Sequence, residues 1–110
     1  MKMQARIGDM SSGHWIGAFY FPPVPLTEGS PDTFACGLPA SRVGDSAAPH
    51  IAFIGGVVPF PPFKHTPKAL TGSATTFING RPAFRAGDKY DCGDIQLGGC
   101  PQVLVGDADL

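Results

Sequence analysis

The chain contains short apolar runs that end at a glycine and are soon followed by a proline. Residues 33–37 and 76–80 are β-prone runs that each end in glycine, and a proline two residues later fixes the next φ angle. Each run therefore predicts a strand, a tight turn and a second strand. Glycine and proline interrupt nearly every stretch of ten residues, so no segment has the i, i+3, i+4 spacing of an amphipathic helix. We expect an all-β protein without a long helix.

The sequence Arg-x-Gly-Asp, with an apolar residue at x, occurs three times, beginning at Arg6, Arg42 and Arg85. A longer unit lies upstream of the last two copies, where residues 29–40 align with residues 72–83 without a gap. Repeated units that stack or arrange radially bring equivalent positions together. The three copies predict a short-strand β-repeat domain with pseudo-threefold repeats.

A truncated third version of the longer unit is predicted at residues 98–107. This segment keeps the glycine-to-glycine spacing of the other two versions. The alignment places Cys100 at the position of Pro31 and Ala74, within a predicted strand.

Composition and charge narrow the class of protein. The 110 residues suffice for one compact core but not for two, and 43% hydrophobic residues are too many for a disordered tail. Charged residues make up 15%, the formal net charge is -1, and the basic residues are scattered, which excludes a nucleic-acid-binding footprint. No apolar run approaches the roughly 20 residues that span a bilayer, and no signal-peptide h-region is present. We expect the protein to start in the cytosol.

Cys36, Cys92 and Cys100 form an odd set without Cys-x-x-Cys spacing. A chain without a secretion signal keeps its thiols reduced, so we do not expect disulfides to stabilise this one. Cys36 lies at the strand position of Asn79. Cys36 and Cys100 are competing candidates for metal binding, but their strand positions favour the role of small buried hydrophobes.

Two segments between the repeats, residues 17–25 and 57–63, are rich in proline and aromatic residues. They are predicted to be extended loops. Such apolar stretches are not expected to be fully solvated, so they either cover the repeat core or form a binding surface, and the first interpretation is favoured.

Three histidines and one cysteine form the sharpest chemical signal. His14 and His50 each lie five residues after the aspartate of a repeat, and Cys92 lies four residues after the third aspartate. His65 falls outside this register, in a neighbouring loop that could supply a fourth ligand. Four such ligands complete the tetrahedral shell of one zinc ion and leave no open position for water or substrate. The predicted zinc role is structural.

The aspartates and arginines of the repeats have a structural interpretation. An aspartate in a Gly-Asp turn commonly accepts hydrogen bonds from nearby backbone N–H groups. The arginines recur with the turns, which indicates bracing of carbonyls or of the adjacent aspartate. The aspartates are Asp9, Asp45 and Asp88, and the arginines are Arg6, Arg42 and Arg85.

Catalysis is not expected. Ser11, Ser12 and Ser46 lack a Gly-x-Ser-x-Gly elbow, and histidines that bind metal cannot also serve as bases. A phosphate-cradling glycine-rich loop before a helix is also missing. We therefore predict a protein that is not an enzyme.

At its repeats the chain resembles the proline-alanine-alanine-arginine (PAAR) repeat family. Residues 39–42 read Pro-Ala-Ser-Arg, residues 82–85 read Pro-Ala-Phe-Arg, and residues 4–6 supply a start fragment, Gln-Ala-Arg. The phenylalanine at position 84 departs from the motif. The resemblance extends over residues 5–107, so we expect residues 1–110 to form a single PAAR-repeat domain without an effector extension.

The resemblance implies a conical, β-helix-like protein that caps the trimeric spike of a type VI secretion system, one cap per trimer. It also implies a zinc ion near the tip, held by three histidines and one cysteine, which carries over to His14, His50, His65 and Cys92. Implied partners are the spike, effector proteins and, transiently, a target membrane. The protein would be a monomer alone, cytoplasmic before firing and then delivered into a target cell. Alternatives are a zinc-stapled adaptor that binds an effector without capping a spike and, less favoured, a zinc hydrolase.

Overall fold

The computed structural model describes residues 1–106, and all the regular structure in this range is β. Within it there is no helix long and apolar enough to cross a membrane. In chain order the strands are β1 (Lys2–Gln4), β2 (His14–Ile16), β3 (Phe19–Phe21), β4 (Phe34–Ala35), β5 (Leu38–Pro39), β6 (His50–Ile54), β7 (Val58–His65), β8 (Phe77–Ile78), β9 (Arg81–Pro82) and β10 (Cys100–Val105). The predicted all-β class is confirmed.

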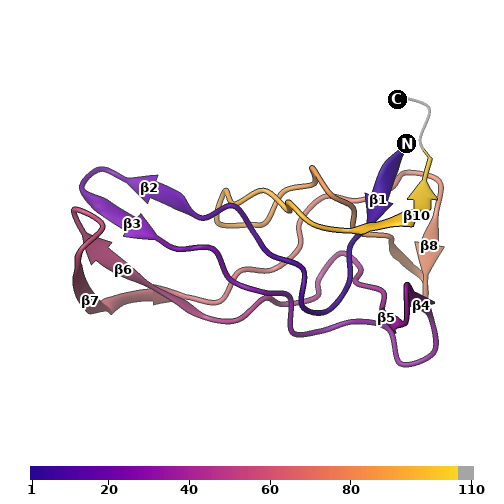
Figure 1. Cartoon of the computed structure of the whole chain (residues 1–110), viewed down its shortest axis with the longest axis horizontal. Helices are drawn as coiled ribbons and strands as arrows, with labels where there is room; N and C mark the ends of the chain where they lie inside the picture. The colour runs from indigo at the N-terminus through magenta and orange to yellow at the C-terminus, as the bar shows by residue number, and fades with distance from the viewer. Residues whose placement is uncertain (107–110) are drawn as a thin grey trace.

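The strands form two groups at opposite ends of an elongated molecule of 40 × 28 × 22 Å (Figure 1). At one end, an antiparallel four-stranded sheet has the order β2-β3-β6-β7, and we call it the distal sheet. At the other end lie three two-stranded antiparallel ladders, β4-β5, β8-β9 and β1-β10, which we call the basal ladders.

Two basal ladders are hairpins closed by the tight turns that the sequence predicted. Cys36 and Asn79 have φ angles of 49° and 51°, and the glycines that follow, Gly37 and Gly80, have φ angles of 78° and 77°. Two successive residues with positive φ form the turn that joins strands with the natural right-handed twist. The strand, turn, strand prediction is therefore confirmed at both places.

The third basal ladder joins the first and last strands of the described chain. Met3 in β1 lies opposite Leu104 in β10, as Pro39 lies opposite Phe34 in the β4-β5 ladder. A ladder thus forms where the truncated third version of the repeat unit was predicted, but its register differs from the prediction by one residue.

Gly99, rather than Gly98, takes the position of Gly29 and Gly72. A Cβ atom added at Gly99 would lie 3.0 Å from a carbonyl oxygen of the paired strand, and atoms added at Gly29 and Gly72 would meet the corresponding oxygens at 3.1 and 2.7 Å. The close approach of the paired strand explains the glycine at all three positions. Spacing alone could not separate two adjacent glycines.

A closed ring of backbone hydrogen bonds joins the three Arg-x-Gly-Asp segments. Ala5 donates to Phe84, Phe84 donates to Ser41, and Ser41 donates back to Ala5, at 2.9, 3.1 and 2.9 Å. The side-chain Nε2 of Gln4 lies 2.8, 2.9 and 3.0 Å from the same three carbonyl oxygens, and Gln4 is only 2% exposed. One amide group therefore caps the whole ring.

Each Arg-x-Gly-Asp turn is braced in the same way. The aspartate carboxylate accepts hydrogen bonds from the backbone N–H and from the guanidinium Nε of the arginine three residues earlier, all at 2.8–3.0 Å. The turn glycines share φ angles of 94°, 93° and 93°. The pairs are Arg6 with Asp9, Arg42 with Asp45 and Arg85 with Asp88. These contacts confirm the predicted bracing role.

The hydrophobic core is small and centres on one large side chain of the ring. Phe84 is fully buried and contacts the Tyr90 ring edge-to-face, with ring centroids 5.1 Å apart. At the corresponding ring positions the side chains of Ala5 and Ser41 are small, so the departure from the family motif at Phe84 fills the space that they leave. The main core cluster is Ala5, Val24, Leu26, Ala47, Ala69, Phe84 and Tyr90.

The two proline-rich segments contain strands of the distal sheet, and the prediction of extended loops was wrong. β7 lies at the sheet edge, where proline is tolerated because an outward-facing N–H is not needed for pairing. Phe21 and Val24 of the first segment are buried. Val57 is 78% exposed and Phe63 48%, so the second segment projects from the molecule instead of covering the core.

Cys36 and Cys100 form a disulfide, which corrects two expectations. Disulfides were not expected, and Cys36 lies exposed in a turn rather than buried in a strand. The register shift places Cys100 at the position of Ser30. Ser30 donates a hydrogen bond to Asn79 at 2.7 Å, so the disulfide replaces the corresponding contact between neighbouring ladders.

We expect Gln4→Met to lower the free energy of unfolding by about 1–3 kcal/mol, because three buried carbonyls lose a shared donor while the side-chain volume is nearly kept. Chemical denaturation measures the change. Gln102→Met, at an exposed position of β10, is the matched control and should change stability by less than about 0.5 kcal/mol. Equal stability of the two variants would show that the cap on the ring contributes nothing.

Candidate metal centre

The structure brings all four predicted ligand residues together. His14 is the first residue of β2, His50 the first of β6 and His65 the last of β7, while Cys92 lies in the turn after Tyr90. Each offers one nitrogen or sulfur atom, and these atoms lie within 4.8 Å of one another. Segments far apart in the sequence therefore meet where the distal sheet begins.

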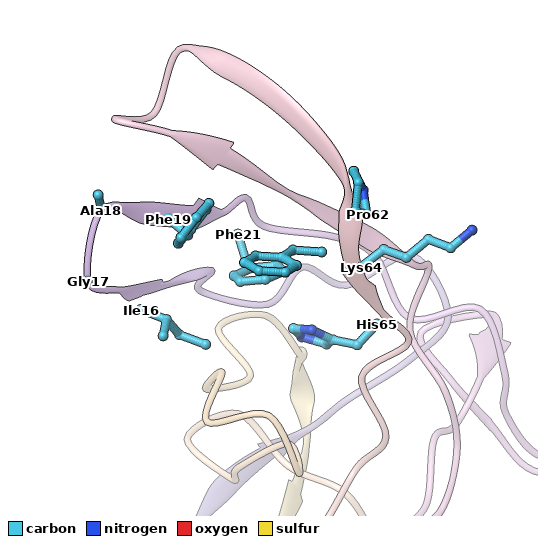
Figure 2. Close-up of a pocket in the computed structure, with 9 residues that line it drawn as sticks. Ile16, Gly17, Ala18, Phe19, Phe21, Pro62, Lys64 and His65 are labelled. Carbon is cyan, nitrogen blue, oxygen red and sulfur yellow. The ribbon is translucent and has the colours of Figure 1, made fainter.

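Strand pairing and one aromatic ring arrange the three imidazoles. His50 lies directly opposite His65 in the β6-β7 pair, and His14 lies opposite Phe21 in the β2-β3 pair. The ring centroid of Phe21 is 4.8, 5.1 and 4.6 Å from those of His14, His50 and His65. Figure 2 shows Phe21 above the His65 ring. The buried phenyl ring thus holds the imidazoles on one side of the cluster.

The ring nitrogens of His50 and His65 converge. Nδ1 of His50 lies 2.8 Å from the carbonyl oxygen of Pro22, to which it donates, and this leaves Nε2 free to face the cluster. That Nε2 atom lies 2.6 Å from Nε2 of His65. Two nitrogen lone pairs this close repel each other unless they share a proton, and a metal ion that binds both nitrogens would also remove the repulsion.

His14 is oriented by an acidic residue that the sequence analysis did not identify. Its Nδ1 contacts the carboxylate of Asp94, and its buried Nε2 has no hydrogen-bond partner among the described residues. Asp94 follows Cys92 by two residues, which was the available signal, but its pairing with His14 depends on contacts 80 residues apart. Nothing in the sequence indicated that the carbonyl oxygen of Pro22 would accept a hydrogen bond from His50.

Burial shifts the ligand pKa values in opposite directions. Desolvation, with help from His50 and His14, lowers the pKa of His65 and favours the neutral imidazole that binds metals. Desolvation also raises the pKa of Cys92 above its usual value, so in the metal-free protein the thiol keeps its proton. A metal ion at this site would displace that proton.

The donor set fits a metal ion. Three imidazoles and one thiolate are the nitrogen and sulfur ligands found in closed tetrahedral zinc sites, and within residues 1–106 the buried Nε2 of His14 has no hydrogen-bond partner. Cys36 and Cys100 are not part of the cluster, since they form the disulfide at the basal ladders. The His/Cys cluster could therefore hold a metal ion.

An apolar groove of about 560 Å³ adjoins the cluster on the distal sheet (Figure 2). His65 forms part of its wall, and Lys64 is the charged residue among those that line it. Its lining residues are Ile16, Gly17, Ala18, Phe19, Phe21, Pro62, Phe63, Lys64 and His65.

The chain matches a known protein family over most of its length. The family model described as PAAR motif matches residues 23–98. The chain belongs to the PAAR motif family. The match includes His50, His65 and Cys92, while His14 precedes it. Membership of the PAAR family implies association with a type VI secretion spike. No curated protein sequence matches the chain at a significant level.

We expect purified protein to contain one tightly bound metal ion per chain by elemental analysis. His50→Ala or Cys92→Ser should remove most of the metal and lower the thermal midpoint, because each leaves only three ligands. The double variant Cys36→Ser, Cys100→Ser should keep its metal, since both residues lie outside the cluster. Metal lost from the double variant but kept in His50→Ala would contradict the assignment.

Proposed function

We propose that the chain is the zinc-stabilised tip protein of a type VI secretion system. It caps the trimeric spike, sharpens it for membrane piercing and attaches effectors, and it is not an enzyme. Before firing it is cytoplasmic, and the apparatus delivers it into a target cell. Membership of the PAAR motif family supports the association with a spike.

One observation carries the capping role. A hollow of about 310 Å³ lies among the basal ladders, and residues from all three ladders line it. Phe34, Phe77 and Leu104 take corresponding places in these ladders and are 57%, 57% and 50% exposed. Exposed apolar patches of this kind mark protein interaction sites. Three similar apolar positions suit an end surface built from three identical chains.

The direction of the cap follows from the position of the two groups of strands. A chain docked through its basal ladders would point its distal sheet away from the spike (Figure 1). The metal cluster lies where strands β2, β6 and β7 of the distal sheet begin or end. A bound ion would therefore stabilise the sheet that projects from the spike.

A zinc ion would supply a structural crosslink at this place. It would connect β2, β6, β7 and the turn that holds Cys92, and four protein ligands would leave no position for substrate. Structural zinc sites can contribute about 10 kcal/mol or more of apparent binding free energy to folding. In a small domain with a small core, such a crosslink would resist local unfolding during piercing.

We expect zinc retention to weaken between roughly pH 6 and 4, because imidazole and thiolate must lose their protons to bind. In the metal-free protein, the pKa of His65 lies below the ordinary 6.5, so the folded state takes up a proton less readily than the unfolded chain. Stability should therefore fall as the pH drops below 6.5. Metal content and thermal midpoints across a pH series measure both effects. A metal-free protein with an unchanged midpoint at neutral pH would contradict the stabilising role.

We expect a monomer in isolation and a complex of one cap with three spike chains, because one chain presents three similar ladders to a trimer. Native mass spectrometry measures the stoichiometry. Three caps per trimer, or a stable cap trimer, would rule out this symmetry match. No complex at all would favour an adaptor that binds an effector without capping a spike.

Matched variants locate the docking face in the same experiment. Phe77→Asp should weaken spike binding at least about tenfold, since a charge would replace an apolar side chain in the interface. Phe63→Asp changes an aromatic residue of similar exposure on the distal sheet and should leave spike binding unchanged.

A further inference from the structure

Asp94 differs from the other buried aspartates of the described chain. Asp45 and Asp88 each accept hydrogen bonds from a guanidinium group and a backbone N–H. Asp94 is 0% exposed, yet within residues 1–106 its carboxylate contacts only the His14 ring, and its Oδ2 atom has no hydrogen-bond partner. Within residues 1–106 the ion-pair partner of Asp94 is His14, which is charged only when it is protonated. A buried carboxylate without a cation is costly.

A metal ion in the cluster would supply that charge. A divalent ion with the Cys92 thiolate and three neutral imidazoles has a net charge of +1. The Asp94 carboxylate would reduce the net charge of the buried site to zero. If His14 were protonated instead, both of its nitrogens would carry protons and it could not bind the ion.

The contact with Asp94 also determines which nitrogen of His14 faces the cluster. When Nδ1 donates its proton to the carboxylate, Nε2 keeps a lone pair, and this is the atom left without a protein partner. Asp94 therefore contacts a ligand that lies 80 residues away in the sequence.

We propose that Asp94 is a positioning residue of the metal centre, which orients His14 and balances the charge of the bound ion. This inference rests on the metal centre proposed above. The Asp94 carboxylate would bind His14 and would not coordinate the ion directly.

Two substitutions separate the parts of this role. Asp94→Asn keeps an oxygen that accepts from Nδ1 but removes the charge, and Asp94→Ala removes both. In competition with a chromophoric zinc chelator, we expect Asp94→Ala to lose about 10–100-fold in zinc affinity and Asp94→Asn to lose about tenfold. Both variants should still bind one zinc ion per chain at saturating zinc.

The matched control is Asp91→Asn, which removes an exposed carboxylate from the same turn. Its Oδ1 atom accepts from the backbone N–H of Lys68, and its exposed charge acts on His65 and Cys92 only through space. A screened surface charge has a small effect, so we expect zinc affinity within about twofold of the unmodified chain. Asp94 variants that also stay within twofold would overturn the proposal.

A measurement on the unmodified chain does not depend on how the variants fold. In the zinc-loaded protein, nitrogen NMR should show His14 bound through Nε2 and protonated at Nδ1. Binding through Nδ1 would overturn the role of Asp94 while leaving the metal centre intact. An unmodified chain that takes up no zinc would overturn the metal centre and this inference together.

Discussion

The ring of backbone hydrogen bonds among Ala5, Ser41 and Phe84 is the constraint on which the rest of the structure depends. It joins three segments with similar sequences, and Gln4 caps all three of its carbonyls. The three segments enter the ring in similar conformations. The strands that precede the ring, β1, β5 and β9, therefore gather at one end of the molecule, and the residues that follow the ring lead to the other end. The hydrophobic core alone is small, so hydrogen bonds and braced turns determine the arrangement.

The metal cluster follows from this arrangement. His14, His50 and Cys92 come a few residues after corresponding turns, so the ring that aligns the turns also brings these side chains near one another. His65 arrives separately, because β7 returns opposite β6. Three ligands therefore depend on the repeated turns and the fourth on a hairpin. This division explains why a protein without a large core can still hold four donor groups together.

Features encoded by local chemistry could be predicted from the sequence. The hairpin turns, the bracing of Asp45 by Arg42 and the gathering of His14, His50 and Cys92 all follow from short patterns that recur in the chain. His65 lay outside these patterns and was predicted only as a fourth ligand from a neighbouring loop. Features that depend on long-range pairing could not be predicted. The strands of the distal sheet, the glycine of the third ladder and the contact of Asp94 with its histidine are decided by segments that meet only in the folded protein.

The disulfide between Cys36 and Cys100 stabilises the ladder that has no connecting turn. Two basal ladders are hairpins, so a tight turn keeps their strands together, but the β1-β10 ladder joins strands from opposite ends of the described chain. That ladder can separate without straining any turn. Cys100 begins β10, and its bond to Cys36 ties this strand to the neighbouring hairpin. At the corresponding place between the β4-β5 and β8-β9 ladders, Ser30 donates a hydrogen bond to Asn79, and Asn79 donates one to Asp32. The covalent crosslink thus lies at the one ladder that lacks a connecting turn, while the metal cluster would crosslink the opposite end.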